Sequence, residues 1–179
     1  MKRLLALLPL IAFLAIVGVG GFVLLQGGAR QDFGKAGLIG KTVPAYAMER
    51  LGGGASVTPT AFEGRPYLIN IFASWCAPCR IEHPVLMQLA QEGTPMLGIA
   101  YKDKPAAAAA MLAELGHPYT VVGLDPEGRY GLDIGVTGVP ETFLVDARGR
   151  IRLIHRGPID DEALETKIRP MLRAMAEGR

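Results

Sequence analysis

The sequence contains only two cysteines among its 179 residues, Cys76 and Cys79, and they lie three positions apart. A fold held together by disulfides would carry several pairs, so that class is excluded. A zinc site usually needs four ligands, and no second Cys-x-x-Cys or spaced His pair exists to complete one. Covalent haem attachment would require His after the second cysteine, where Arg80 stands. The single cysteine pair is therefore available for redox cycling.

An excess of charge of either sign is also missing from most of the chain. Three of the 19 basic residues lie in the first 30 positions, where no acid occurs, so residues 31–179 carry 16 basic and 17 acidic residues. No basic face remains that would bind nucleic acid. These roughly 149 residues are enough for one hydrophobic core without disulfide staples.

Only one long apolar run is present, at the N-terminus. Lys2 and Arg3 precede an uncharged stretch of 22 residues from Leu4 to Leu25. Such a stretch can cross a hydrocarbon core of ~30 Å as a helix. It is longer than the ~7–15-residue apolar region of a cleaved signal peptide. We therefore expect a transmembrane signal anchor with its N-terminus in the cytoplasm; a signal peptide cleaved near residues 27–29 is the alternative.

These observations divide the chain into three parts. The anchor is expected over residues 1–26, a flexible tether rich in small and polar residues over 27–40, and a soluble domain over 41–179. With either an anchor or a cleaved signal, both cysteines end on the far side of the membrane.

The soluble part alternates between strand-like and helix-like patterns. Asp160 or Asp161 should cap the last helix, and Pro84 and Pro170 should bend the helices that contain them. The order predicts an α/β domain with helices on both faces of a mixed central sheet. Strands are expected over 43–48, 67–72, 96–101, 119–122, 142–146 and 151–155, and helices over 79–91, 105–115 and 161–175.

The cysteine pair follows the apolar run Tyr67–Phe72 and begins a helix. A helix N-terminus offers unpaired N–H groups and a partial positive charge, which stabilise a thiolate. This predicts Cys76 as the exposed nucleophile and Cys79, one turn later, as the resolving thiol. Copper binding by these two thiols and His83 is an alternative that the residue types leave open.

A second motif precedes the last hairpin. Pro140 stands at the entry to an expected central strand, where a trans proline paired in the sheet would be unfavourable. A cis Val139–Pro140 bond would place it in a tight turn instead. Such a turn leaves neighbouring backbone groups free to pair with an extended substrate beside the cysteines.

Together these motifs resemble the thioredoxin superfamily, through Trp75-Cys76-x-x-Cys79, Pro84 five residues later, and Pro140. Within it, the chain is similar to the membrane-anchored thiol–disulfide oxidoreductases of bacterial cytochrome c maturation, over roughly residues 38–175. The stretches that carry this narrower resemblance are Leu68–Cys76, Arg80–His83, Ala100–Asp103, Leu115–Tyr119, Gly131–Val136 and Gly138–Leu144.

The resemblance implies a thioredoxin fold with an added N-terminal β-hairpin, supplied by the stretch from Val43 to about Ala61. It implies a dithiol reductant that keeps the haem-attachment cysteines of apocytochrome c, or a partner thiol protein, reduced. Electrons would come from a transmembrane thiol reductase. The domain would lie in the periplasm, held to the bacterial inner membrane by its anchor, and the exchange needs no metal or organic cofactor.

One position departs from thioredoxin, which has a buried Asp six residues before its first cysteine. Here that residue is Asn70, which cannot take up a proton. Glu82, one helical turn after Cys79, and Glu141, next to Pro140, are therefore the candidates for proton transfer. The alternatives are a solvated helix position for Glu82 and a substrate-facing surface charge for Glu141.

Further residues are expected to support the exchange. Trp75, Pro78 and Val139, together with Pro140, should shape the groove that receives the partner, although core packing is an alternative for Trp75. Two rival functions are a broad-range exported thioredoxin-like oxidoreductase and a non-enzymatic copper-delivery protein. Copper-delivery relatives of this fold use Cys-x-x-x-Cys with a distant His, and this spacing is absent.

Overall fold

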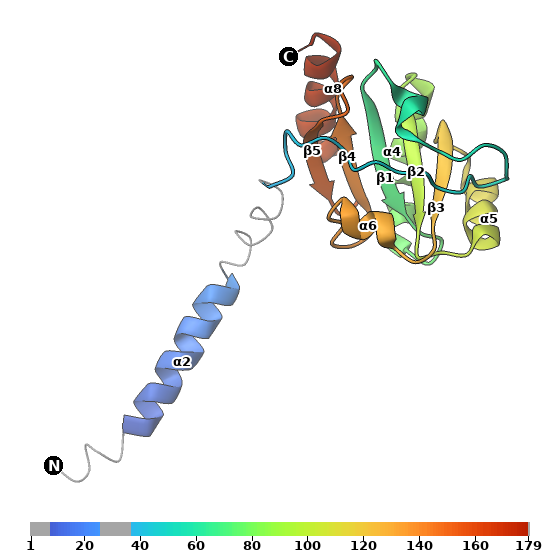
Figure 1. The fold of residues 1–179 in the computed structure, drawn as a ribbon. Helices are drawn as coiled ribbons and strands as arrows, with labels where there is room; N and C mark the ends of the chain where they lie inside the picture. The colour runs from blue at the N-terminus through green and yellow to red at the C-terminus, as the bar shows by residue number, and fades with distance from the viewer. Residues whose placement is uncertain (1–7, 26–36, 179) are drawn as a thin grey trace. The chain divides into compact units, whose positions relative to one another are not determined.

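The computed structural model describes residues 8–25 and 37–178, and the chain divides into two compact units, the first ending at Gly37 and the second beginning at Leu38. In the first unit, helix α2 (Leu8–Leu25) contains 18 residues (Figure 1). Over the described residues, no helix combines the length and the apolar character that a membrane crossing requires, so the predicted transmembrane helix is not shown. Residues 1–7 and 26 of the expected anchor and 27–36 of the expected tether lie outside the described residues.

The second unit is built on a five-stranded mixed sheet in the order β3-β2-β1-β4-β5. The first three strands run parallel, and β4 is antiparallel to both β1 and β5, which confirms the predicted mixed sheet. The strands are β1 (Tyr67–Phe72), β2 (Met96–Tyr101), β3 (Val121–Asp125), β4 (Glu141–Val145) and β5 (Ile151–Arg156).

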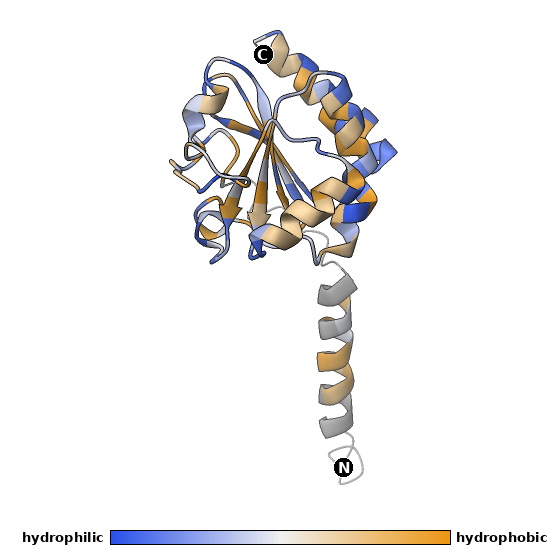
Figure 2. Cartoon of the chain, turned by 90° about the vertical axis from the view of Figure 1, so that its right-hand side faces the viewer, coloured by the Kyte–Doolittle hydropathy of each residue, from blue (hydrophilic) through white to orange (hydrophobic). Residues whose placement is uncertain are grey.

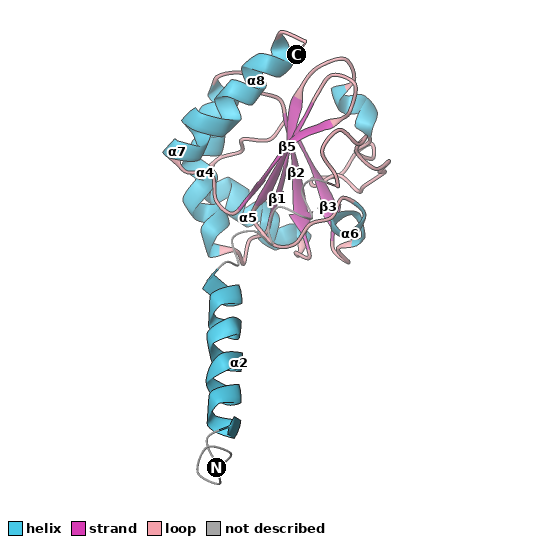
Figure 3. Cartoon of the chain, turned by 90° about the vertical axis from the view of Figure 1, so that its left-hand side faces the viewer, coloured by secondary structure: helices cyan, strands magenta, loops and turns pink. Residues whose placement is uncertain are grey.

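Helices cover both faces of this sheet (Figure 3). Because β1, β2 and β3 follow one another in one direction, right-handed crossovers place α4 and α5 on the same face. The C-terminal helical segment joins them there, and α6 lies on the other face with the segment that precedes β1. The helices are α4 (Ala77–Gln91), α5 (Pro105–Leu115), α6 (Arg129–Asp133), α7 (Asp161–Ala163) and α8 (Arg169–Ala176), with a short 3₁₀ turn η2 (Pro59–Phe62).

The sheet separates two hydrophobic clusters, because alternate side chains of a strand point to opposite faces. Leu68 and Phe72 of β1 belong to the same cluster as both cysteines, whereas Ile69 and Ile71 belong to the cluster on the other face. We call these the cysteine face and the opposite face of the sheet. The strands at the centre of the domain are correspondingly rich in hydrophobic residues (Figure 2).

The C-terminal helical segment is continuous but changes its hydrogen-bonding pattern. Asp160 caps it, since its carboxylate accepts a hydrogen bond of 2.7 Å from the Ala163 N–H, as predicted. A π-helical stretch η3 (Leu164–Ile168) then leads into α8, with Pro170 in the first turn of α8. Pro170 stands inside this continuous helical segment, and the hydrogen-bonding pattern changes in the turn before it, which is the turn that a proline without an N–H disrupts.

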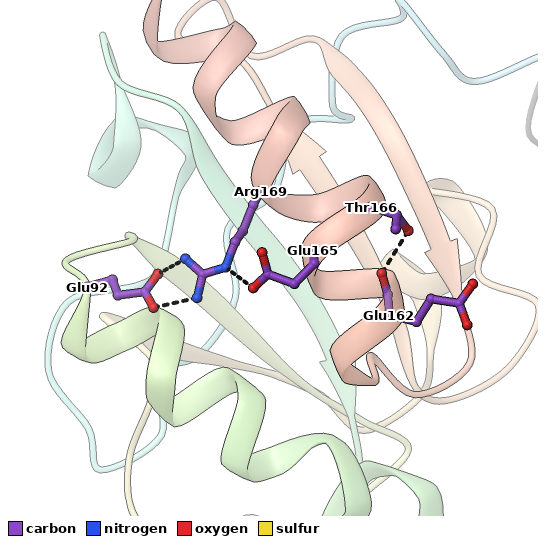
Figure 4. Close-up of polar contacts among 5 residues, drawn as sticks. All are labelled: Glu92, Glu162, Glu165, Thr166 and Arg169. Carbon is purple, nitrogen blue, oxygen red and sulfur yellow. Dashed lines mark hydrogen bonds and ion pairs between the residues drawn. The ribbon is translucent and has the colours of Figure 1, made fainter.

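Arg169 ties this segment to the end of α4. Its guanidinium donates two hydrogen bonds to the Glu92 carboxylate, of 2.7 and 2.6 Å, and a third of 2.7 Å to Glu165 (Figure 4). Glu92 stands at the C-terminal end of α4, where a negative charge is unfavourable next to the helix dipole. The arginine neutralises that charge.

Two expectations about the fold need correction. The expected strand 43–48 and its hairpin partner are not strands: the N-terminal segment has only single bridges, Thr42 to Arg150, Met48 to Val57 and Arg50 to Gly123. The glycine run 52–54 turns the chain, but the arms pair at only one position. The strand expected over 119–122 begins at Val121 and continues to Asp125. The short helix α6 was not expected, because five residues give too little periodicity to detect.

Candidate active site

Strand β1 carries the cysteine pair to the start of α4. Cys76 is the N-cap of this helix, and its Sγ accepts a 3.1 Å hydrogen bond from the Cys79 N–H. The two cysteines form a disulfide with an S–S distance of 2.04 Å. Pro78 occupies the first helical turn, where its missing N–H costs nothing. The sulfur of Cys76 thus receives one of the otherwise unpaired N–H groups of the helix, an arrangement that favours a thiolate after reduction.

The disulfide is less accessible than the sequence predicted. Cys76 is 3% exposed and Cys79 1% exposed, and both belong to the hydrophobic cluster between the sheet and α4. The expectation of an exposed Cys76 is therefore wrong for the oxidised protein. The close packing of β1 against α4 encloses the N-cap side chain together with the helix residue it bonds.

Trp75, immediately before the disulfide, is 60% exposed, so core packing is excluded for it. Its indole Nε1–H donates a 3.1 Å hydrogen bond to the Lys102 carbonyl, at the end of β2. The ring is therefore held at its polar edge while much of its surface faces solvent. This is the arrangement expected for an aromatic side chain that contacts a partner.

The Val139–Pro140 peptide bond is cis, as predicted. Pro140 directly precedes β4, and residue 141 pairs with Ile71 near the C-terminal end of β1, so this turn lies at the sheet edge where β1 leads to the cysteines. Val139 is half-buried and packs against the cluster that contains both cysteines. The Pro140 carbonyl is not free, since it accepts a 3.0 Å hydrogen bond from the Gly157 N–H.

A buried polar network lies on the cysteine face behind the disulfide. Asn70 in β1 is fully buried, and its Nδ2 donates hydrogen bonds of 2.9 Å to Glu82 Oε1 and to Thr142 Oγ1. Its Oδ1 accepts a 2.7 Å hydrogen bond from the Tyr119 hydroxyl. The second oxygen of Glu82 accepts a 2.9 Å hydrogen bond from the Ile159 N–H. Strand β1, helix α4 and the segment after β5 thus meet at the Glu82 carboxyl group, and β4 joins the network through Asn70.

Glu82 is fully buried on the same face of α4 as Cys79, which excludes the solvated-position alternative. Burial raises the pKa of Glu82 to about 7, and the hydrogen bonds from Ile159 and Asn70 oppose this shift only in part. In the described part of the chain its hydrogen-bond donors are neutral, namely the Asn70 amide and the Ile159 N–H, and the Tyr119 hydroxyl lies beyond Asn70. A carboxyl with this pKa can release and take up a proton near neutral pH.

Glu141 has a different position from the one the sequence suggested. It is 1% exposed, and its neighbours along β4 place it on the opposite face from the cysteines. Its carboxylate accepts hydrogen bonds of 2.6 Å from Arg156 Nε and 2.9 Å from the Thr137 N–H. The interpretations of Glu141 as a substrate-facing charge or as a proton carrier for the thiols do not fit this position. The side chain follows the alternation of β4, which a single position next to a proline does not reveal.

His83 is buried and engaged elsewhere. Its Nε2 lies 3.0 Å from the Gly116 carbonyl at the end of α5, and burial lowers the pKa of its ring. In the described residues, no three His, Cys, Asp or Glu side chains come together as a metal site. The copper-binding alternative therefore has no ligand set in this part of the chain.

The family of the chain follows from its similarity to known proteins. A family model described as Redoxin matches residues 38–168. The chain is 43% identical over 178 residues to the thiol:disulfide interchange protein HelX of Rhodobacter capsulatus, which covers 99% of this chain and 100% of HelX. The chain belongs to the thiol:disulfide interchange proteins of the Redoxin family.

Other members of this family agree. The thiol:disulfide interchange protein DsbE of Escherichia coli is 40% identical over 175 residues, covering 96% of this chain and 95% of DsbE. A crystal structure assigned as a DsbE from Chlorobium tepidum has a TM-score of 0.64 at 30% identity, over 75% of this chain and 97% of the other. With a bonded Cys-x-x-Cys pair at a helix N-terminus, this interchange protein is a thiol:disulfide oxidoreductase.

Two residues around the site were not found from the sequence. Tyr119 and Thr142 complete the network around Asn70, and each lies far along the chain from its partner. Asp103 ends the stretch Ala100–Asp103 that carries the family resemblance, and it holds the backbone before the cysteines. The sequence indicated this side of the domain for Asp103, because the carboxyl ends of parallel strands share one sheet edge.

Proposed function

We propose that this chain is a periplasmic, membrane-anchored dithiol reductant in cytochrome c maturation. It would keep the haem-attachment cysteines of apocytochrome c, or a partner thiol protein, reduced. The observation that carries the proposal is the Cys76–Cys79 disulfide at the start of α4, with the cis Val139–Pro140 turn packed against the same cluster, in a chain that is similar to HelX and DsbE over nearly all of their length.

The reaction is a two-electron exchange. The Cys76 thiolate attacks one sulfur of the partner disulfide, that S–S bond breaks, and the partner's first thiolate leaves. The Cys79 thiol then loses its proton and attacks Cys76. The mixed disulfide breaks, the second partner thiolate leaves, and the Cys76–Cys79 disulfide forms. The partner disulfide is reduced and this dithiol is oxidised; a transmembrane thiol reductase then restores the dithiol.

Glu82 is proposed as the group that accepts the proton from Cys79 and returns it when the disulfide is reduced. Its burial on the Cys79 face of α4 and its pKa of about 7 support this role. Asn70 would orient the carboxyl through its amide. Trp75, Pro78, Val139 and Pro140 would form the groove for the partner, since all four belong to the segments that flank the disulfide.

Membrane anchoring is part of the proposal. Six large apolar side chains of α2 are exposed, and a group of exposed apolar side chains is stabilised by an apolar environment such as a membrane. These side chains are Phe13, Leu14, Ile16, Val17, Val19 and Phe22. Fractionation of the native host would test it: recovery in the membrane pellet, resistant to carbonate extraction, is expected. Recovery of a shortened chain in the soluble periplasmic fraction would show that the segment is a cleaved signal.

Trapping with Cys79→Ala tests the substrate. Without the resolving thiol, the mixed disulfide at Cys76 persists and its partner can be identified by mass spectrometry from the native host. Cys76→Ala/Cys79→Ala is the matched control and should trap nothing. Adducts dominated by apocytochrome c or a thiol protein of cytochrome assembly are expected. Adducts with many unrelated exported proteins would instead show a broad-range oxidoreductase.

A further inference from the structure

The loop after β2 contains a carboxylate that the exchange mechanism does not use. Asp103 is 9% exposed, and its Oδ2 accepts a 2.6 Å hydrogen bond from the Ser74 N–H. Its Oδ1 accepts hydrogen bonds of 2.8 Å from Ser74 Oγ and from the Lys104 N–H. Ser74 is two residues before Cys76. One side chain from the end of β2 therefore holds the backbone from which the nucleophile projects.

The same loop also holds the side chain of Trp75, the residue between Ser74 and Cys76. Trp75 donates its indole N–H to the carbonyl of Lys102, the residue before Asp103. Ser74 and Trp75 are thus fixed by adjacent residues of one loop, the first through its backbone and hydroxyl, the second through its ring. The hydrogen bond to Lys102 therefore fixes the polar edge of the Trp75 ring, while most of the ring stays exposed to solvent.

The loop itself is braced. Lys102 has φ +48°, the only positive φ of a non-glycine residue among the described ranges, and its N–H donates a 2.9 Å hydrogen bond to the Asp125 carbonyl. A Cβ on Gly128 would come within 2.4 Å of Lys102 Cε, and one on Gly131 within 2.3 Å of Tyr101 Cε2. The β3–α6 turn therefore packs directly against the loop. A non-glycine residue keeps a left-handed conformation only where its surroundings enforce it.

We propose that Asp103 is a positioning residue: it fixes the Ser74–Trp75–Cys76 turn so that Trp75 presents a preformed apolar surface to an extended polypeptide partner. Charge-assisted hydrogen bonds are the strong ones, and three of them converge on this carboxylate. A surface that is already ordered loses less entropy when a partner docks. The proposal rests on the exchange reaction in the proposed function, and it does not depend on which protein is the partner.

This role differs from an effect of the Asp103 charge on the thiols. A positioning role concerns docking, so it acts on large partners and spares small ones. A charge effect would change the reactivity of Cys76 toward every disulfide and would shift the reduction potential of the pair. The two roles therefore separate when a large and a small disulfide are compared.

The full-length protein with Asp103→Ala provides the test, and the sequence supplies a clean probe, because Trp75 is its only tryptophan. Two rate constants of the reduced protein are measured, with hydroxyethyl disulfide and with a disulfide-bonded peptide of about ten residues that contains Cys-x-x-Cys-His. We expect the rate constant with the peptide to fall at least tenfold further than that with hydroxyethyl disulfide. Time-resolved anisotropy of Trp75 should show faster local motion, with an unchanged reduction potential.

Ser74→Ala is the milder companion variant, because it removes only the hydroxyl bond and keeps both the carboxylate and its backbone bond. It should give an intermediate change in both readouts, and it keeps the test possible if Asp103→Ala does not fold. Equal losses with both disulfides, a shifted potential, or unchanged Trp75 anisotropy would each overturn the positioning role. If the wild-type protein reduced neither disulfide, the exchange function would fail, whereas the anisotropy would still report on the loop.

Discussion

Glu82 and Glu141 are both fully buried, yet they lie on opposite faces of one sheet and have different partners. Glu82, on the cysteine face, accepts hydrogen bonds from an amide and a peptide N–H. Glu141, on the opposite face, is paired with Arg156 at 2.6 Å. The first carboxyl is desolvated without a countercharge, and its pKa rises to about 7. The second is compensated by a cation that joins β4 to β5.

The difference shows how one residue type serves two purposes. A buried carboxylate with a bidentate or charged partner is a structural tie, because removing either partner leaves an uncompensated charge. A buried carboxyl among neutral donors instead changes its protonation near neutral pH, which suits proton transfer beside a dithiol. Both glutamates are buried, so the presence of Arg156 beside Glu141 and of neutral donors beside Glu82 distinguishes their roles.

Among the changes considered, breaking the ion pair between Glu141 and Arg156 should lower the free energy of unfolding most. Arg156→Met leaves the buried Glu141 carboxylate without its cation, and we expect the free energy of unfolding to fall by about 3–5 kcal/mol. Urea unfolding at pH 7 measures it. The rate of exchange with hydroxyethyl disulfide should change little in the protein that stays folded, because this pair lies across the sheet from the thiols.

The double variant Glu141→Leu/Arg156→Met is the control. Removing both charges eliminates the uncompensated carboxylate, so much of the lost stability should return. Since Arg156 has a further contact, a remainder of the loss is expected in the double variant. A single variant as stable as the wild type would show that the pair does not hold β4 to β5.

On the cysteine face, the comparison predicts a dependence of stability on pH. The folded-state pKa of Glu82, about 7, lies above its ordinary value of 4.5, so the folded protein binds the proton more tightly than the unfolded chain. Stability from this group is complete below pH 4.5 and is lost as the pH rises through 7. The shift corresponds to about 3 kcal/mol between pH 4.5 and 8. Urea unfolding across this range measures it.

Glu82→Gln separates this contribution from others. The amide cannot titrate, so the difference in stability between wild type and variant should itself change by about 3 kcal/mol over the range. His83 has a lowered pKa and acts in the opposite direction below pH 6.5, but it is present in both proteins and cancels. The absolute stability is not informative, because Gln places a second donor beside the Ile159 N–H. A difference that stays constant with pH would contradict the proton-carrying role.

The sequence predicted those parts of the fold that local patterns determine. Strands β1 and β2 and helix α5 were predicted to the residue, because each is one compact run that is mostly apolar or rich in alanine. The N-terminal hairpin was not, since the resemblance implied it and the segment itself has no alternating pattern. α6 was missed because it is shorter than two helical turns.

At the site, spacing was enough for the thiols and the cis proline but not for the polar network. Both glutamates were nominated from their distance to a motif, and only one faces the cysteines. The decision depends on the register of β4, in which Thr142 lies opposite Asn70 and Glu141 points away. Register is a long-range property, so neither Thr142 nor Tyr119 could be placed beside Asn70 before the sheet was known.

Two buried tyrosines, one on each face of the sheet, extend the comparison to the smallest expected effect. Tyr119, on the cysteine face, donates its hydroxyl to Asn70 Oδ1 at 2.7 Å, whereas the buried Tyr130 hydroxyl on the opposite face has no hydrogen-bond partner among the described residues. Tyr119→Phe keeps the ring stacked on Phe72 and leaves the Asn70 oxygen unpaired, so it should cost about 1–2 kcal/mol. Tyr130→Phe removes a hydroxyl that is desolvated without compensation, so it should be neutral or slightly stabilising. Thermal unfolding of both variants side by side measures the contrast, and equal losses would mean that the network adds nothing beyond ring packing. The rate of dithiol oxidation, measured as a function of pH, provides a second readout. Because Tyr119 orients the Asn70 amide that holds Glu82, only Tyr119→Phe should shift this pH profile.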